Sequence, residues 1–206
     1  FRSTDTFTLT VRPVNDLPTM DPLFDRTIPE DGATAELPVV IGDLETPTAN
    51  LTLSGKSDNP ALVPASAFTF GGQGANRTVV VTPAADQSGT ANVTITVSDG
   101  QDTAARTFRL NVIAVDDGPT VSPIADVVMD EDTTSAPIPF WFGDIDTPVA
   151  DVIVTAFPED GVLLPPDLFV LKGTGTNRTL TVTPRQNRSG STKVTVRIND
   201  GSLHPT

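Results

Sequence analysis

The residues in this sequence whose types and spacing could do chemistry are carboxylates, and they gather at four kinds of place. Each place holds one or two acidic residues, with Asn, Gly or Pro next to them or a few positions away. In the N-terminal half the four places are Asn15-Asp16, Glu30-Asp31, Asp43-Leu44-Glu45 and Asp99-Gly100. Clustered carboxylates with Asn and backbone carbonyls, and without His or Cys, suit a hard cation that takes about six to eight oxygens. The pattern therefore predicts calcium binding.

The same four places recur 101 residues later in the sequence. When residues 15–105 are placed on residues 116–206 without a gap, 31 of the 91 positions are identical. The recurring places are Asp116-Asp117, Glu131-Asp132, Asp144-Ile145-Asp146 and Asp200-Gly201. A fixed period of this length is that of a whole sandwich domain and is longer than a solenoid repeat. The sequence therefore predicts two tandem domains of one kind.

Turn preference is the competing explanation for these acidic residues. Asp and Asn tolerate positive φ and hydrogen-bond to their own backbone in turns, which accounts well for a single site such as Asp99-Gly100. Turn preference does not explain why two acids alternate before Thr-Pro at both Asp43 and Asp144, because like charges held close together repel unless something compensates them. Both interpretations stay open for any one residue, while the set as a whole favours a cation.

Alternation of apolar and polar residues with a period of two predicts strands throughout. It is clearest at Val93–Val97 and Thr107–Val112, and no stripe of helical period occurs. The expected strands lie near residues 20–29, 34–41, 50–55, 66–70, 77–82, 91–98 and 104–113, and again 101 residues later. Seven strands per repeat predict an all-β protein of two tandem Greek-key β-sandwiches, cadherin-like or immunoglobulin-like, arranged as an extended rod.

The strand pattern also predicts which side chains form the cores. In Ile138–Phe142, alternation puts Phe140 on one face and Trp141 on the other, so Trp141 should keep contact with solvent. The expected core residues are Phe68, Val81, Val93, Ile95 and Val97 in the first repeat, and Phe169, Val182, Val194, Val196 and Ile198 in the second.

Composition restricts the partners of the chain. Acidic residues outnumber basic ones 26 to 13, and the net charge of −13 repels nucleic acids and anionic lipids. There is no cysteine, and the single histidine, His204, has no partner for a catalytic triad or a zinc site. No segment approaches the roughly 20 apolar residues of a transmembrane helix, so direct membrane insertion is not expected. The N-terminus lacks a signal-peptide pattern, and we expect an internal segment of a larger protein.

The repeat sets the expected domain boundaries. Thr6–Val11 aligns with Thr107–Val112, so residues 1–14 are expected to be the last strand of a preceding repeat. Residues 15–115 are then repeat one, and residues 116–206 are repeat two without its last strand. Because unpaired strand edges seek partners, we expect head-to-tail strand exchange, in which the first strand of one molecule completes repeat two of the next.

The order and spacing of these motifs resemble the cadherin-like repeats of large bacterial surface adhesins. The matching pieces are Asn15-Asp16 and Asp116-Asp117 for the cadherin linker, Asp43-Leu44-Glu45 and Asp144-Ile145-Asp146 for its Asp-x-Asp motif, Asp99 and Asp200 for its closing Asp, and Pro29-Glu30 for the Pro-Glu of its first strand. The family's Asp-Arg-Glu motif is replaced by Ala85-Asp86-Gln87-Ser88-Gly89 and by Gln186-Asn187-Arg188.

The resemblance implies calcium ions at the junctions between repeats. At the junction of the two repeats the implied ligands are Glu30, Asp86, Asp116, Asp117, Asp144, Asp146 and Asp200. At the first linker they are Asn15, Asp16, Asp43, Glu45 and Asp99.

The expected function is that of a calcium-rigidified stalk or adhesion module of a cell-surface or secreted multi-repeat protein, extracellular and not an enzyme. The expected partners are the adjacent repeats of the same chain and a homophilic, cell-surface or glycan ligand. The alternative is a carbohydrate-binding or accessory β-sandwich module of a secreted enzyme. That alternative requires a row of exposed aromatic residues, and the absence of Tyr together with a single Trp does not favour it.

Overall fold

The computed structural model describes residues 1–202, and its regular elements are β-strands apart from two 3-10 helices. The chain divides into two compact units, unit 1 (Phe1–Val115) and unit 2 (Asp116–Thr206). The two helices, η1 (Ala65–Ala67) and η2 (Pro166–Leu168), have three residues each, and no helix in the described part could cross a membrane. The all-β fold expected from the sequence is confirmed. His204 lies outside the described residues.

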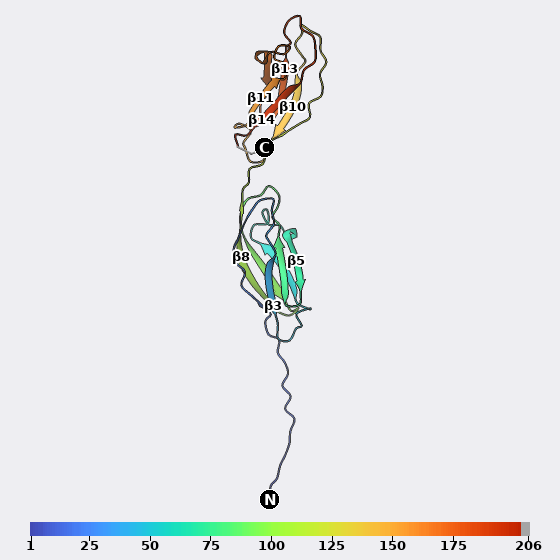
Figure 1. The fold of residues 1–206 in the computed structure, drawn as a ribbon. Coiled ribbons are helices and arrows are strands. Elements are labelled where there is room, and N and C mark those ends of the chain that lie inside the picture. The colour runs from blue at the N-terminus through green and yellow to red at the C-terminus, as the bar shows by residue number, and fades with distance from the viewer. Residues whose placement is uncertain (203–206) are drawn as a thin grey trace. The chain divides into compact units, whose positions relative to one another are not determined.

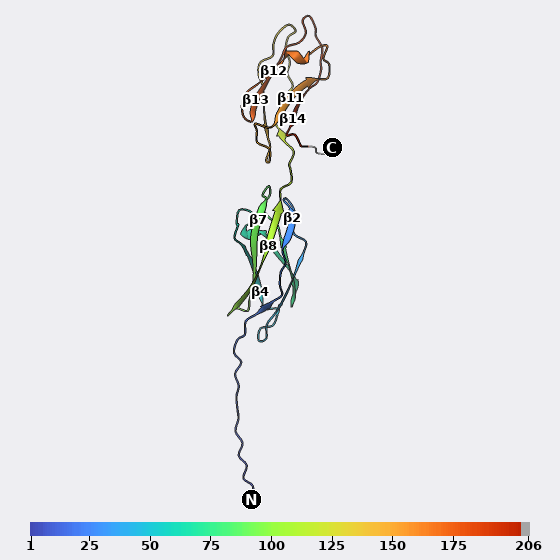
Figure 2. The same cartoon turned by 90° about the vertical axis from the view of Figure 1, so that its left-hand side faces the viewer.

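Unit 1 is built from two four-stranded sheets (Figure 1, Figure 2). The first sheet is antiparallel and has the order β1 (Thr19–Met20), β3 (Leu37–Gly42), β6 (Asn76–Val81) and β5 (Phe68–Gln73). The second has the order β2 (Arg26–Pro29), β8 (Thr103–Ile113), β7 (Gly89–Ser98) and β4 (Thr52–Ser57). Within it only β2 and β8 run parallel to each other.

The core of unit 1 is formed by side chains that alternate along these strands. Strand β3 buries every second residue, from Leu37 to Ile41, and β7 does the same from Ala91 to Val97. Val81, Val93, Ile95 and Val97 are buried as expected, while Phe68 is half-buried against this core. Gly55 on β4 explains the position of Phe68, because a Cβ at residue 55 would lie within 2.7 Å of three atoms of the Phe68 ring.

The first expected strand, residues 20–29, is wrong as a single element. It is two short strands, and residues 21–25 carry the chain from the first sheet to the second. Asp21-Pro22 lies at this crossing, where proline cannot donate a backbone hydrogen bond to a ladder. Strand β1 therefore pairs with β3, whereas β2 pairs with β8.

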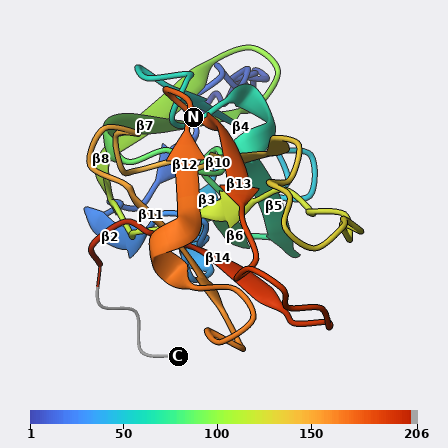
Figure 3. The same ribbon diagram turned by 90° about the horizontal axis from the view of Figure 1, so that it is seen from above.

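Unit 2 repeats the first sheet of unit 1 but not the whole of the second. Its four-stranded sheet has the order β12 (Phe169–Lys172), β13 (Asn177–Val182), β10 (Ile138–Gly143) and β9 (Thr120–Val121). Strands β12 and β13 lie side by side in Figure 3. The other sheet has two strands, β11 (Ile153–Pro158) and β14 (Val194–Asn199).

Two strands of unit 1 have no counterpart among residues 116–202. The position of β8 in the repeat begins at residue 204, which lies outside the described residues. Residues 127–130, at the position of β2, form no strand, and in unit 1 β2 is held by its parallel pairing with β8. The main cluster of buried residues in unit 2 consists of Phe140, Leu180 and Val182.

The expected core of repeat two is therefore only partly correct. Val182 is buried, but Val194 is 36% exposed, so its predicted burial is wrong. Phe169, Val196 and Ile198 are half-buried rather than buried. Their alternation is right, but among residues 116–202 no strand pairs with the other edge of β14. The expected exposure of Trp141 is confirmed, since 52% of the side chain is exposed.

Candidate cation sites at the poles of the two units

The acid-x-acid turn of unit 1 fixes one carboxylate by hydrogen bonds to its own backbone. Asp43 directly follows β3, and its Oδ1 accepts the N–H groups of Glu45 at 3.0 Å and Thr46 at 2.6 Å. This arrangement is an Asx turn, which a short acidic side chain forms readily. The second oxygen, Oδ2 of Asp43, is buried and has no hydrogen-bond partner. Turn preference therefore accounts for one oxygen of Asp43 and not for the other.

The same arrangement occurs at the corresponding turn of unit 2. Asp144 follows β10, and its Oδ1 accepts the N–H groups of Asp146 at 3.0 Å and Thr147 at 2.6 Å. Oδ2 of Asp144 is again buried without a hydrogen-bond partner. A buried anionic oxygen that lacks a hydrogen bond is costly, and such atoms are usually satisfied by an ion, a donor or a water molecule. The repetition makes these two oxygens the strongest candidates for cation ligands.

The second acid of each turn holds the linker that precedes its unit. In unit 1, Oε2 of Glu45 accepts the backbone N–H of Asp16 at 3.1 Å. In unit 2, Oδ2 of Asp146 accepts the backbone N–H of Asp117 at 2.7 Å. The linker carboxylates are thereby attached to the turn that contains the buried oxygen. We call this end of each unit its N-terminal pole.

Asn15 adds two amide hydrogen bonds to the N-terminal pole of unit 1. Its Nδ2 donates to Oδ2 of Asp99 at 3.0 Å and to Oδ2 of Asp102 at 2.9 Å. Oδ1 of Asp99 accepts the backbone N–H groups of Gln101 and Asp102 at 2.7 and 2.6 Å. The Asn15 amide, followed by these backbone donors, lowers the pKa of Asp99 below its usual value. Asp99 is thus kept ionised and oriented.

Unit 2 has a carboxylate where unit 1 has this amide. The residue at the position of Asn15 is Asp116. At the position of Asp99, Oδ1 of Asp200 accepts the N–H and the hydroxyl of Ser202, both at 2.8 Å. In the sequence of unit 2 an acidic residue thus replaces the amide donor that Asn15 supplies in unit 1.

The C-terminal pole of unit 1 carries a second set of carboxylates. Glu30 is buried, with 5% of its surface exposed, and its Oε1 accepts the backbone N–H of Val115 at 2.7 Å. Oδ1 of Asp31 accepts the N–H of Asp86 at 3.0 Å, and both residues have positive φ, 59° and 55°. The fold thus brings Glu30 and Asp86 to the end of unit 1 from which the chain continues, and their role as cation ligands stays a prediction.

Two carboxylates near these sets were missed by the sequence reasoning. Asp31 stands beside Glu30 and is not among the predicted ligands, although its Oδ1 accepts the backbone N–H of Asp86. Asp102 lies three residues after Asp99 and shares the Asn15 amide with it. Neither was distinguishable in the sequence from the other turn residues, because Asp102 has no acidic counterpart in repeat two and Asp31 matches no named motif.

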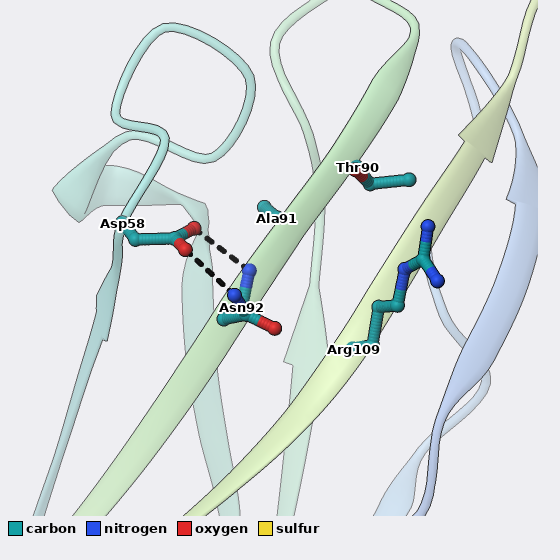
Figure 4. Close-up of a pocket in the computed structure, with 5 residues that line it drawn as sticks. All are labelled: Asp58, Thr90, Ala91, Asn92 and Arg109. Carbon is teal, nitrogen blue, oxygen red and sulfur yellow. Dashed lines mark hydrogen bonds between the residues drawn. The ribbon is translucent and has the colours of Figure 1, made fainter.

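A polar depression on β7 offers a possible alternative site and is explained by packing. It has a volume of about 360 Å³ and is lined by Asp58, Thr90, Ala91, Asn92 and Arg109 (Figure 4). Both oxygens of Asp58 accept hydrogen bonds from Asn92, at 2.8 Å from the backbone and 2.7 Å from the side-chain amide. These bonds lower the pKa of Asp58, the backbone one most. A carboxylate held in this way is a structural group and no acid or base partner faces it in the depression.

The sequence of residues 15–111 matches the family model described as a bacterial Ig domain. Unit 1 is similar to a bacterial Ig domain over these residues. Unit 2 repeats the sequence pattern and the first sheet of unit 1, which is consistent with tandem bacterial cadherin-like or Ig-like β-sandwich repeats. Domains of this family are typically extracellular surface modules. No curated protein matches the sequence.

Solved structures similar to the chain include other tandem sandwiches. The titin domains Z1Z2, solved in complex with telethonin, are 14% identical over 87% of this chain and 93% of that one, with a TM-score of 0.37. Domains 3–6 of protocadherin gamma B2 are 16% identical over 82% of this chain and 39% of that one, with a TM-score of 0.40. An endo-fucoidan hydrolase of glycoside hydrolase family 107 is 15% identical over 91% of this chain and 27% of that one, with a TM-score of 0.39. Similarities this low do not extend to function.

Proposed function

We propose that this chain is a non-enzymatic stalk or adhesion module of a cell-surface or secreted multi-repeat protein, in which calcium at the poles of the domains makes successive repeats rigid. The observation that carries the proposal is the buried Oδ2 of Asp43 and of Asp144, without a hydrogen-bond partner at the same turn of both units. Because the two oxygens occupy equivalent positions of the two repeats, a bound cation explains them better than turn formation at each site separately does.

The donor set agrees with calcium rather than with a transition metal. The sites contain carboxylates, Asn15 and backbone carbonyls, and the chain has no cysteine. At the junction of the two repeats the proposed ligands are Glu30, Asp86, Asp116, Asp117, Asp144, Asp146 and Asp200, and at the first linker Asn15, Asp16, Asp43, Glu45 and Asp99. Calcium, when bound, would supply a positive charge that offsets the mutual repulsion of these carboxylates.

The residues of the chain prepare such a site before any ion arrives. The Asx turns hold Asp43 and Asp144 with one oxygen occupied by backbone donors. Glu45 and Asp146 hold the linker N–H groups, and buried Glu30 holds the N–H of Val115. The linker between the units is hydrogen-bonded to Glu30 at Val115 and to Asp146 at Asp117. A cation bound by these carboxylates would therefore restrict the motion of the linker, and restricting each linker would make an array of repeats stiff.

A calcium titration followed by calorimetry and thermal melting tests the proposal. At a calcium concentration about 100 times the dissociation constant, linkage adds about 2.7 kcal/mol to the stability of the folded state. For a domain of this size that raises the melting temperature on the order of 10 °C. D144N and D43N should each weaken binding, whereas D151N, which removes the same charge from an exposed loop, should bind like the wild type. A melting temperature indifferent to calcium and to EDTA would contradict calcium binding.

The stiffening itself needs a separate measurement. Small-angle scattering with calcium and with EDTA reports whether the distribution of dimensions broadens when the ion is removed. D144A/D146A should resemble the EDTA sample even in calcium, because both ligand-bearing side chains of the turn are lost. If calcium binds but the two scattering profiles coincide, the ion has a local stabilising role and the stalk mechanism is wrong. Binding to a glycan array would instead favour the carbohydrate-binding alternative.

A further inference from the structure

Arg77 is an arginine on the core face of a strand in unit 1. It lies on β6, where it pairs with Val39 of β3, and Val79 and Val81 follow it at intervals of two. Both valines are buried, and side chains two residues apart on a strand share a face. Arg77 is therefore on the core face, at the end of the strand, and it is half-buried. A guanidinium in such a place needs hydrogen-bond acceptors.

The guanidinium of Arg77 bridges two connections of unit 1. Its Nε donates to the backbone carbonyl of Gly74 at 2.8 Å, and its Nη2 donates to the backbone carbonyl of Thr48 at 3.0 Å. Gly74 belongs to the turn between β5 and β6, and Thr48 belongs to the connection between β3 and β4. Because a guanidinium is planar and holds its donors in a fixed geometry, one side chain fixes the two carbonyls relative to each other.

The connection that Arg77 holds is the one that carries Asp43. Thr48 follows the Asx turn of Asp43 directly, in a second turn that is closed by a hydrogen bond from the Asn50 N–H to the Pro47 carbonyl at 2.8 Å. The strand before Asp43 is bonded to the β5–β6 turn as well, because the N–H of Ile41 donates to the carbonyl of Ala75 at 2.9 Å. The Asp43 turn is thus attached to the β5–β6 turn on both of its sides.

The guanidinium does not satisfy the acid of this turn. Both of these hydrogen bonds of Arg77 end on carbonyls, and Oδ2 of Asp43 is buried without a hydrogen-bond partner. A bond from Arg77 to that oxygen would have taken the place of a cation. A positive charge at the same pole repels a cation, so the charge of Arg77 by itself works against binding there. Any contribution of Arg77 to the site must therefore come from its position-fixing hydrogen bonds.

Unit 2 has an arginine at the same position of its own acid turn. Arg178 pairs with Phe140 of β10, and its guanidinium carbon lies 5.6 Å from the centre of the Phe142 ring, a cation–π contact. Phe142 stands two residues before Asp144, where unit 1 has Ile41. Its N–H donates to the carbonyl of Thr176 at 3.1 Å, which repeats the attachment of the strand to the neighbouring turn. In both units an arginine thus contacts a segment next to the buried carboxylate oxygen.

We propose that Arg77 is a positioning residue of the cation site in unit 1, which holds the Asp43 turn in place by bridging Thr48 and Gly74. The inference rests on the calcium site proposed above, but the bridge exists without the ion and can be tested without it. R77M keeps an apolar stem and removes both donors and the charge. R77K keeps the charge but lacks the planar pair of donors. R109M, which changes an exposed arginine of β8, is the control for the loss of charge.

Amide hydrogen exchange in EDTA measures the bridge without calcium. The N–H of Thr46 is bonded to Oδ1 of Asp43 and reports on the turn. Its exchange should become about tenfold faster in R77M and in R77K, the effect of losing one good hydrogen bond, and should be unchanged in R109M. The amides of β7 should keep their protection, and if R77M loosens the whole unit, the milder R77K decides. Equal Thr46 exchange in the wild type and R77K would overturn the proposal.

A calcium titration followed by NMR at the Thr46 amide then separates position from charge. Removal of a positive charge by itself should tighten calcium binding, whereas loss of the bridge should weaken it. We expect R77M and R77K to raise the dissociation constant about tenfold, and R109M to bind like the wild type. Binding by R77M that is equal to the wild type or tighter would overturn the role of Arg77 and leave the calcium site intact. A wild-type Thr46 amide that does not respond to calcium would instead contradict the calcium site, and the exchange measurement alone would decide whether Arg77 positions Asp43.

Discussion

The two units have closely related sequences, yet among the described residues only unit 1 encloses its core. Val93 and Val194 are the same residue at the same position of the repeat, and they are 0% and 36% exposed. The difference arises from the partner strand, because β7 is paired with β8, whereas within residues 1–202 β14 pairs with β11 alone. A strand's alternation decides which side chains face inward, and its neighbours decide whether that face is covered.

The N-terminal poles differ in one donor. In unit 1 the Asn15 amide donates to Asp99 and Asp102, and in unit 2 the residue at the position of Asn15 is Asp116. The residue at the position of Asp102 is Leu203, so the two poles carry the same number of acidic residues. The difference lies in which of these positions is acidic and which carries the amide.

The largest expected effect is on the stability of the two cores. V93A should destabilise unit 1 by about 2 kcal/mol, since it removes fully buried methyl groups and leaves a cavity. V194A, the matched change in unit 2, should cost less than about 0.5 kcal/mol, because solvent already reaches that side chain. Chemical denaturation with separate probes for each unit measures both. Equal losses of stability would mean that the Val194 side chain is covered in solution.

An effect of comparable size is expected at Gly55, where Ala156 of unit 2 carries one more methyl group. Unit 2 has Ala156 at this position, opposite the equivalent Phe169. In unit 1 an added Cβ would lie as close as 2.4 Å to the Phe68 ring, so G55A should cost about 1–3 kcal/mol by overpacking. A156G in unit 2 should cost no more than the roughly 0.5–1 kcal/mol attributed to strand glycine. A G55A variant as stable as the wild type would show that Phe68 moves freely.

The smallest expected effect is a change in a single titration at the pole of unit 1. The Asn15 amide is the largest cause of the lowered pKa of Asp99, so N15A should raise that pKa toward its usual value. Because the folded-state pKa is depressed, the stabilisation is present above the unfolded-state pKa and is lost as the pH falls through the folded-state pKa. NMR titration of the Asp99 carboxyl carbon follows the shift. An unchanged midpoint in N15A would assign the lowered pKa to the backbone donors of Gln101 and Asp102 instead.

Much of this protein was determined by local sequence alone. The repeat, the all-β class, the outward position of Trp141 and the Asx turns at Asp43 and Asp144 depend on short patterns, because alternation and turn chemistry act over a few neighbouring residues. The backbone hydrogen bonds of these turns close within three residues, so no distant partner is needed to form them.

Other features were decided only by the tertiary structure. The division of residues 20–29 between two sheets and the parallel pairing of β2 depend on β8, which lies more than 70 residues away in the sequence. The burial of Glu30 and the exposure of Val194 likewise depend on a distant strand, present in one case and absent from the described residues in the other. The periodicity of the sequence shows which side chains share a face of a strand. Whether that face is buried depends on the neighbouring strands, which are known only once the sheets have assembled.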